Sequence, residues 1–156
     1  MTEPRRLLVV THSQSGGTAA MTDALLAGAG DPAIDGVEVV WRDALTAGVD
    51  DVLASDAVVL GTPENFGYMS GALKHFFDRI YHPCLERTRG RPYVLFVKAS
   101  HDGSGAVTSV QRIVTGLAWR EILPPLVVVG RLHDDQLEAA HELGLTVAAG
   151  LEAGLW

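Results

Sequence analysis

Hydroxyl groups and glycines are concentrated in the segment Thr11-His12-Ser13-Gln14-Ser15-Gly16-Gly17-Thr18, directly after the apolar run Leu7 to Val10. Glycine lets a backbone approach an anion closely, the first N–H groups of a helix point toward it, and hydroxyls donate hydrogen bonds to it. The segment contains no lysine or arginine, so dipoles and neutral donors would have to balance the charge. This pattern favours a phosphate monoester held in place over a phosphoryl group in transfer, which usually needs a cation or a metal.

Two further segments combine glycines with aromatic, amide or imidazole groups after an apolar run. Gly61 to Gly71 contains Phe66 and Tyr68, and Ala99 to Gly105 contains His101. Such loops can present backbone N–H and C=O groups to the edge of a planar heterocycle while an aromatic side chain covers one face. One loop suited to phosphate and two suited to a flat polar ring indicate a mononucleotide. Flavin mononucleotide (FMN) fits best, and an adenine nucleotide is the alternative.

These residues also have simpler explanations. A hydroxyl of the first segment can serve only to cap the helix that begins near Thr18. Phe66 and Tyr68 can be ordinary packing residues. His12 and His101 lie beside the proposed ligand, but a histidine in a loop is most often solvated, so we assign neither a catalytic role.

Apolar runs rich in Val and Leu recur between segments of helical periodicity. The runs are continuous rather than alternating, which is typical of strands buried on both faces of a parallel sheet. The expected strands are Leu7 to Val10, Val37 to Trp41, Ala57 to Leu60, Tyr93 to Val97 and Leu126 to Val129. Helices are expected at about 18–27, between 43 and 55, between 71 and 86, between 105 and 119, and after Asp134 or Asp135, either of which can cap the last one.

This alternation predicts an α/β fold, a doubly wound five-stranded parallel sheet with helices on both faces. In such folds ligands bind at the carboxyl ends of the strands, where the strand order reverses. The three loops described above all follow strands and are therefore expected at one edge of the sheet. Because the chain shows no linker or repeat, we expect residues 1–156 to form a single domain.

Composition restricts the partners. The formal net charge of −7 argues against a nucleic acid or a membrane surface, because such partners are bound through lysine and arginine. Cys84 is the only cysteine, which excludes an internal disulfide, and with His82 it offers too few ligands for a metal. The apolar stretch near the N-terminus is too short for a signal peptide or a membrane span. We therefore expect a cytoplasmic protein without a metal.

The chain resembles the flavodoxin-like superfamily over essentially its whole length, which implies the strand order 2-1-3-4-5. Ser13 to Thr18 resembles the superfamily's phosphate signature. Thr62 to Gly71, followed by Leu73-Lys74 and Phe77-Asp78, is similar to the flavin-ring loop and helix of NAD(P)H-dependent FMN and quinone reductases. The resemblance implies FMN contacts from Ser13, Gln14, Ser15, Gly16, Gly17 and Thr18 at the phosphate, and from Pro63, Glu64, Asn65, Phe66, Gly67, Tyr68, Ser100, His101, Asp102 and Gly103 around the ring.

The same resemblance implies an oxidoreductase. A hydride from NADPH or NADH would reach flavin N5, and the electrons would pass to a quinone, a flavin or a similar small acceptor with ping-pong kinetics and no catalytic protein residue. A flavodoxin-type electron carrier that docks on redox partner proteins is the main alternative. A regulatory module without flavin is a third, against which the intact phosphate loop argues. Related reductases commonly build the acceptor pocket between subunits, and the apolar residues of Leu151 to Trp156 favour a homodimer.

Overall fold

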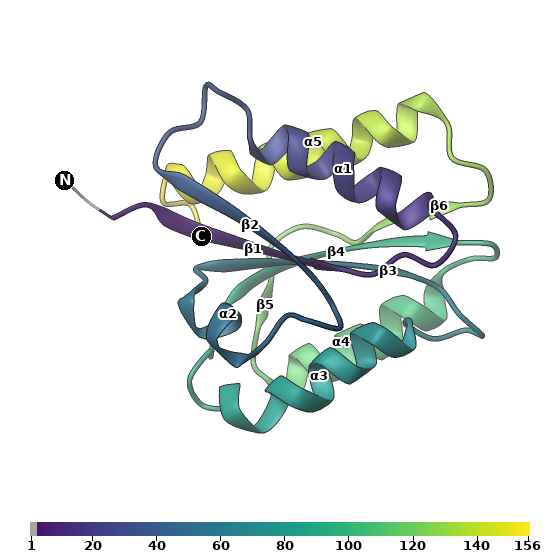
Figure 1. Ribbon diagram of the computed structural model, residues 1–156, viewed down its shortest axis with the longest axis horizontal. Helices are drawn as coiled ribbons and strands as arrows, with labels where there is room; N and C mark the ends of the chain where they lie inside the picture. The colour runs from purple at the N-terminus through teal and green to yellow at the C-terminus, as the bar shows by residue number, and fades with distance from the viewer. Residues whose placement is uncertain (1–2) are drawn as a thin grey trace.

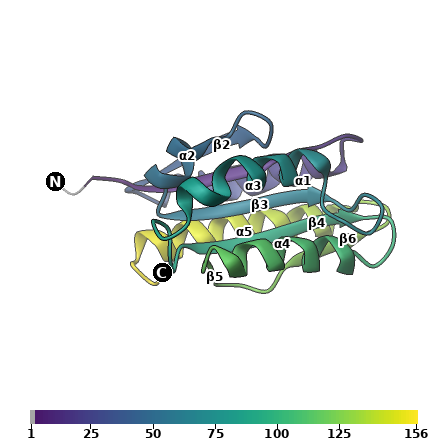
Figure 2. The ribbon, with the colours of Figure 1, turned by 90° about the horizontal axis from the view of Figure 1, so that it is seen from below.

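A parallel sheet separates two layers of helices in the computed structural model, which describes residues 3–156 (Figure 1). The helices α1 (Gly17–Ala29) and α5 (Asp134–Glu152) cover one face. The helices α2 (Val49–Ala54), α3 (Gly71–Cys84) and α4 (Ser104–Gly116) cover the other, where α3 and α4 run alongside the central strands (Figure 2). The α/β class and the doubly wound arrangement expected from the sequence are confirmed.

The strands follow the order β2-β1-β3-β4, and every pairing is parallel. They extend the expected apolar runs by one to three residues at their ends. Their bounds are β1 Arg5–Thr11, β2 Val37–Asp43, β3 Ala57–Pro63, β4 Pro92–Ala99, β5 Arg120–Glu121 and β6 Leu126–Val129.

The fifth position of the sheet is divided between two short strands. β5 pairs with Pro92 and Tyr93 at the start of β4, whereas β6 pairs with Phe96–Ala99 at its end. Pro124 and Pro125 lie between β5 and β6 and have no backbone N–H, so a continuous ladder cannot form there. The expected order 2-1-3-4-5 is confirmed, but β5 was missed because its two residues, Arg and Glu, carry no apolar signal.

Each central strand contributes to two apolar cores because its side chains alternate between the faces of the sheet. On β1, Leu8 and Val10 face α3, while Leu7 and Val9 face α1 and α5. All four side chains are fully buried, and burial of each stabilises the fold by roughly 1.5–3 kcal/mol. The apolar runs are thus continuous because the strands are buried on both faces of the sheet, as the sequence indicated.

Glycines allow α1 and α5 to pack in direct backbone contact. A Cβ on Gly28 would lie 1.9 Å from the carbonyl oxygen of His141, and one on Gly144 would lie 2.0 Å from that of Leu25. On α5, Ala140 and Val147 are buried on the same side of the helix as Gly144. This contact holds α1, and therefore the loop before it, in a fixed place above the sheet.

The predicted cap of α5 was wrong. The N-cap position is His133, whose N–H donates to Oε1 of Gln136 at 2.6 Å. Asp134 and Asp135 lie in the first turn, where they interact with the helix dipole instead.

The loops that follow β1, β3 and β4 gather at one end of the sheet, and both chain ends lie toward the other (Figures 1 and 2). Leu151 is buried, and the Trp156 indole packs on Gly150 and donates to the carbonyl of Val147 at 3.2 Å. Leu151 and Trp156 of the segment proposed as a dimer contact therefore pack on their own chain, whereas Leu155 is exposed, and the dimer stays a prediction. Among residues 3–156, no helix combines the length and apolarity that a bilayer crossing requires.

Candidate functional site

The first loop ends at an open helix terminus. The N–H of Gly16 donates to Oγ of Ser13 at 3.1 Å, and Gly16 adopts a left-handed conformation with φ of +93°. Within residues 3–156, no side chain caps α1 and no acidic residue lies in its first turn. The interpretation of the hydroxyls as a simple helix cap was therefore wrong. The first N–H groups of α1 therefore have no side-chain acceptor within the described residues, an arrangement that is able to bind an anion.

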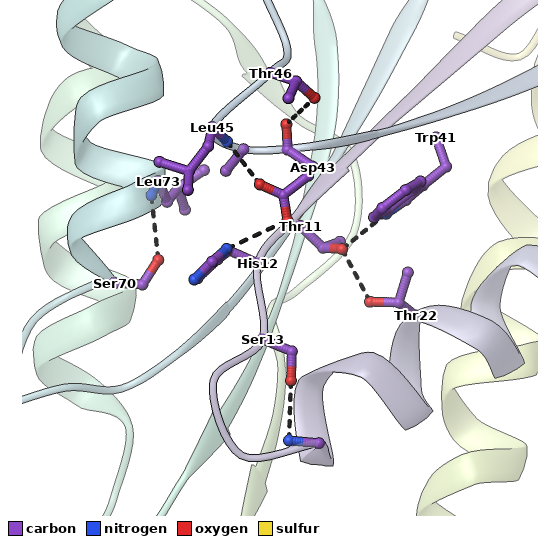
Figure 3. A network of polar contacts seen from close by, with 12 residues as sticks. Thr11, His12, Ser13, Thr22, Trp41, Asp43, Leu45, Thr46, Ser70 and Leu73 are labelled. Carbon is purple, nitrogen blue, oxygen red and sulfur yellow. Dashed lines mark hydrogen bonds and ion pairs between the residues drawn. The ribbon is translucent and has the colours of Figure 1, made fainter.

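A polar network fixes the base of this loop (Figure 3). Thr11 Oγ1 accepts a hydrogen bond from Nε1 of Trp41 at 2.9 Å and lies 3.1 Å from the hydroxyl of Thr22 on α1. Nδ1 of His12 lies 3.3 Å from a carboxylate oxygen of Asp43 at the end of β2. His12 is thus not the freely solvated residue that the sequence suggested, because only 21% of its side chain is exposed.

The second loop contains a tight hairpin turn. The N–H of Asn65 donates to the carbonyl of Tyr68 at 2.8 Å, and the return bond measures 3.0 Å. Phe66 and Gly67 between them have φ of +53° and +69°. Glycine accepts this conformation freely, but for Phe66 it costs about 1–2 kcal/mol. The Phe66 side chain is fully exposed and that of Tyr68 is 41% exposed, so the packing explanation was wrong for Phe66.

Side chains join the second loop to its neighbours. Nδ2 of Asn65 donates to Oε1 of Gln14 in the first loop at 2.7 Å. Oε2 of Glu64 accepts the N–H groups of Gly105 and Ala106, at 3.1 and 3.2 Å, and so caps α4. A Cβ on Gly105 would lie 1.9 Å from the carbonyl oxygen of Gly67, which shows how closely the second loop lies on this helix.

The third loop is held mainly by its own residues. Oδ1 of Asp102 accepts the backbone N–H of Ser104 at 3.0 Å and its hydroxyl at 2.9 Å, and these bonds lower the pKa of Asp102. Gly103 has φ of +77° and is buried, with Val127 where its Cβ would be. Asp102, Gly103 and Glu64 therefore shape the site.

A cleft of about 310 Å³ lies between the second and third loops. Of the predicted site residues, Glu64, Asn65, Phe66, Gly67, Ser100 and His101 line it. Pro63 is the last residue of β3, below the turn. A second cleft of about 340 Å³ lies on the far side of the first loop, between α1 and β2, lined in part by His12, Trp41 and Asp43.

Sequence reasoning missed Lys98. Its side chain lies over the first residue of α1, with Cγ 3.1 Å and Cε 3.3 Å from the point where a Cβ on Gly17 would be. Because the phosphate loop contains no lysine or arginine, only dipoles and neutral donors were expected there, but the fold places the side chain of Lys98 beside it. The two-residue period of the strand could have revealed this position, because Lys98 lies on the same face of β4 as Val94 and Phe96, which pack beneath α1.

No group of three or more His, Cys, Asp or Glu side chains within residues 3–156 is arranged to hold a metal ion.

A model of the family described as NADPH-dependent FMN reductase matches residues 35–134. The chain belongs to this family. The matched part of the FMN reductase family includes the second and third loops, whereas the first loop precedes it.

Similar proteins agree with the fold. A curated flavodoxin from Aquifex aeolicus (strain VF5) is 28% identical over 112 residues, which are 72% of this chain; the chain spans 60% of that flavodoxin's length. A flavodoxin from the domain Archaea has a TM-score of 0.79 at 20% identity, covering 94% of this chain and 99% of that one. A WrbA-like flavodoxin from Agrobacterium tumefaciens has a TM-score of 0.75 at 20% identity, with 96% and 98% covered. The chain is thus a flavodoxin-like member of the FMN reductase family.

Proposed function

We propose that this protein holds FMN across the three loops and acts as an NAD(P)H-dependent reductase of quinones, flavins or similar small acceptors. The open N-terminus of α1 carries the proposal. Within the described part of the chain, it lacks a side-chain cap, while α4 on the opposite face of the sheet is capped by Glu64. FMN has an anionic phosphate at one end and a flat ring at the other. The uncapped N-terminus of α1 suits the phosphate, and the cleft between the second and third loops suits the ring.

The residues fit this cofactor at both ends. At the tail, the N–H groups of the first turn of α1 and the hydroxyls of Ser13 and Ser15 are the donors that a phosphate needs. At the head, the second and third loops border a cleft of about 310 Å³. The hydrogen bond between Asn65 and Gln14 holds the second loop, at the ring, next to the first loop, at the phosphate. Bound FMN would supply the redox chemistry, accepting and donating a hydride.

The chain's own residues would bind the flavin, orient it and shield part of its ring from solvent. The exposed ring of Phe66, held at a turn that disfavours it, borders the cleft and is our first candidate to cover one face of the flavin ring; Tyr68 is the second candidate for this role. Backbone groups of residues 63–68 are the proposed contacts to the polar edge of the ring. Because the cleft is open to solvent on the side of His101, one face is left for donor and acceptor in turn.

A flavodoxin-type electron carrier is the second candidate. The similarity to a curated flavodoxin and the net charge of −7 favour it, because acidic surfaces steer docking onto basic redox partners. The two candidates share the cofactor and differ in whether nicotinamide reaches the ring.

Flavin content and NAD(P)H oxidation of the purified protein test both candidate functions. We expect a yellow protein that releases FMN on denaturation and oxidises NADPH or NADH rapidly when a quinone is present. Phe66→Ala should weaken flavin binding by about fivefold to 150-fold, since aromatic stacking contributes roughly 1–3 kcal/mol, whereas Leu155→Ala, an exposed apolar control, should not. Reduction by dithionite but not by NADPH would support the carrier. Absence of FMN binding at micromolar concentrations would refute both.

A further inference from the structure

Lys98 continues a row of core residues to the end of β4, where it is paired with Pro63 of β3 and Val128 of β6. Val94 and Phe96 belong to the core beneath α1 and α5, and Lys98 is the next residue on the same face of β4. Its carbonyl accepts the N–H of Glu64 at 3.0 Å, which fixes the backbone at the start of the second loop. The strand therefore directs the side chain toward α1 from a firmly held position.

Gly17 makes room for this side chain. With no Cβ at Gly17, the aliphatic part of Lys98 lies on the helix start, with Cγ, Cε and Cδ at 3.1, 3.3 and 3.6 Å from the point where a Cβ would be. Nζ is one bond beyond Cε, so the ammonium lies near the first turn of α1. Lysine commonly packs its stem on apolar surface and presents its charge at the end.

The charge of Lys98 has no partner among residues 3–156. Over residues 3–156, its ammonium makes no ion pair with a carboxylate and donates no hydrogen bond, although acidic residues exceed basic ones and the net charge is −7. Lys74 on α3, by contrast, pairs with Asp78 at 2.5 Å. A partly buried cation that faces a positive helix end is unfavourable unless an anion lies between them.

We propose that Lys98 is the cation for the phosphate of FMN and sets the preference of this site for phosphorylated over unphosphorylated flavin. The inference rests on the proposed function. A phosphate monoester carries about 1.5–2 negative charges, and a helix start offers roughly half a positive charge. Lys98 supplies the remainder from a strand, although the loop itself contains no basic residue. Riboflavin has the same ring without the phosphate and gains nothing from Lys98.

The test is a titration of apoprotein with FMN and with riboflavin, followed by flavin fluorescence. Lys98→Met keeps the stem on Gly17 and removes the charge. We expect it to raise the Kd for FMN by about tenfold to a hundredfold, from the size of charged hydrogen bonds, and to leave the Kd for riboflavin within about twofold. Arg112→Met removes the same charge from an exposed position on α4 and should change neither Kd. Added salt should weaken FMN binding more in the wild type than in Lys98→Met.

The outcomes separate the two proposals. Equal losses for FMN and riboflavin in Lys98→Met indicate a packing role and overturn this inference, as does an unchanged Kd for FMN. Both results leave the proposed function intact. A folded wild-type protein that binds neither flavin refutes the proposed function and this inference with it.

Discussion

Helices α1 and α4 begin alike, yet their first turns are used in opposite ways. Each follows a glycine in the left-handed conformation, Gly16 at φ +93° and Gly103 at φ +77°. Carboxylate oxygens of Glu64 and Asp102 occupy the start of α4. In the part of the chain that the structure describes, no side chain does so for α1, and a lysine lies beside it. The protein thus supplies its own anion where a helix positions a loop, and leaves open the terminus where a ligand anion would bind.

The largest expected effect comes from the glycines in these first turns. Gly105→Ala places a Cβ 1.9 Å from the backbone oxygen of Gly67, so the second loop must move. We expect a destabilisation of about 1–3 kcal/mol, measured by urea unfolding, and a loss of flavin binding. Gly17→Ala is the matched control for stability alone, because its Cβ meets only the flexible stem of Lys98 at 3.1 Å. Equal destabilisation by the two variants would contradict the distinction drawn between the helices.

Glu64→Ala tests whether the stability of the protein depends on the cap that the Glu64 carboxylate provides for α4. The change removes the acceptor of two N–H groups and should cost about 1–2 kcal/mol in the free energy of unfolding. Glu142→Ala, at an exposed position on α5, should have little effect. If Glu64→Ala leaves stability unchanged, solvent caps α4 as well as Glu64 does, and the two helix starts do not differ as proposed.

A smaller effect is expected for the bond between the first and second loops. Single and double substitutions to alanine at Gln14 and Asn65 should show a coupling energy of about 0.5–1 kcal/mol in FMN binding, because their side chains meet at 2.7 Å in an exposed position. Isothermal titration calorimetry on the four proteins measures it. Strict additivity would mean that the two loops hold the ligand independently.

The smallest effect concerns Asp102, whose pKa is lowered by the Ser104 backbone N–H and then by its hydroxyl. A lowered pKa in the folded state means that the carboxylate stabilises the fold above its ordinary pKa and loses this effect as the pH falls through the lowered value. Asp102→Asn keeps a capping group without charge. We expect the variant to be less stable than the wild type at neutral pH and equal to it in acid, by urea unfolding. A difference that grows toward acid would contradict the assignment.

Sequence patterns predicted the parts of the molecule that depend on local chemistry. The apolar runs located all the long strands, and the glycine-rich segments located the three loops at one end of the sheet. They did not reveal that the carboxylate of Glu64 caps α4, or that Lys98 reaches Gly17. Both contacts join segments more than 40 residues apart, and their partners are fixed by strand register and close backbone approach, which composition does not encode. The predicted cap of α5 was wrong because the helix begins one residue earlier than expected, with His133 at the N-cap and its N–H donating to Oε1 of Gln136.

The prolines that divide the outer strand also lie on the rim of the sheet. An uninterrupted rim would present a row of free N–H and C=O groups, on which an unfolded neighbour can add its own strand. Pro124 and Pro125 leave stretches of only two and four residues, in β5 and β6, for such pairing. The sheet is therefore protected on this side against aggregation by strand addition, with no need for a covering helix.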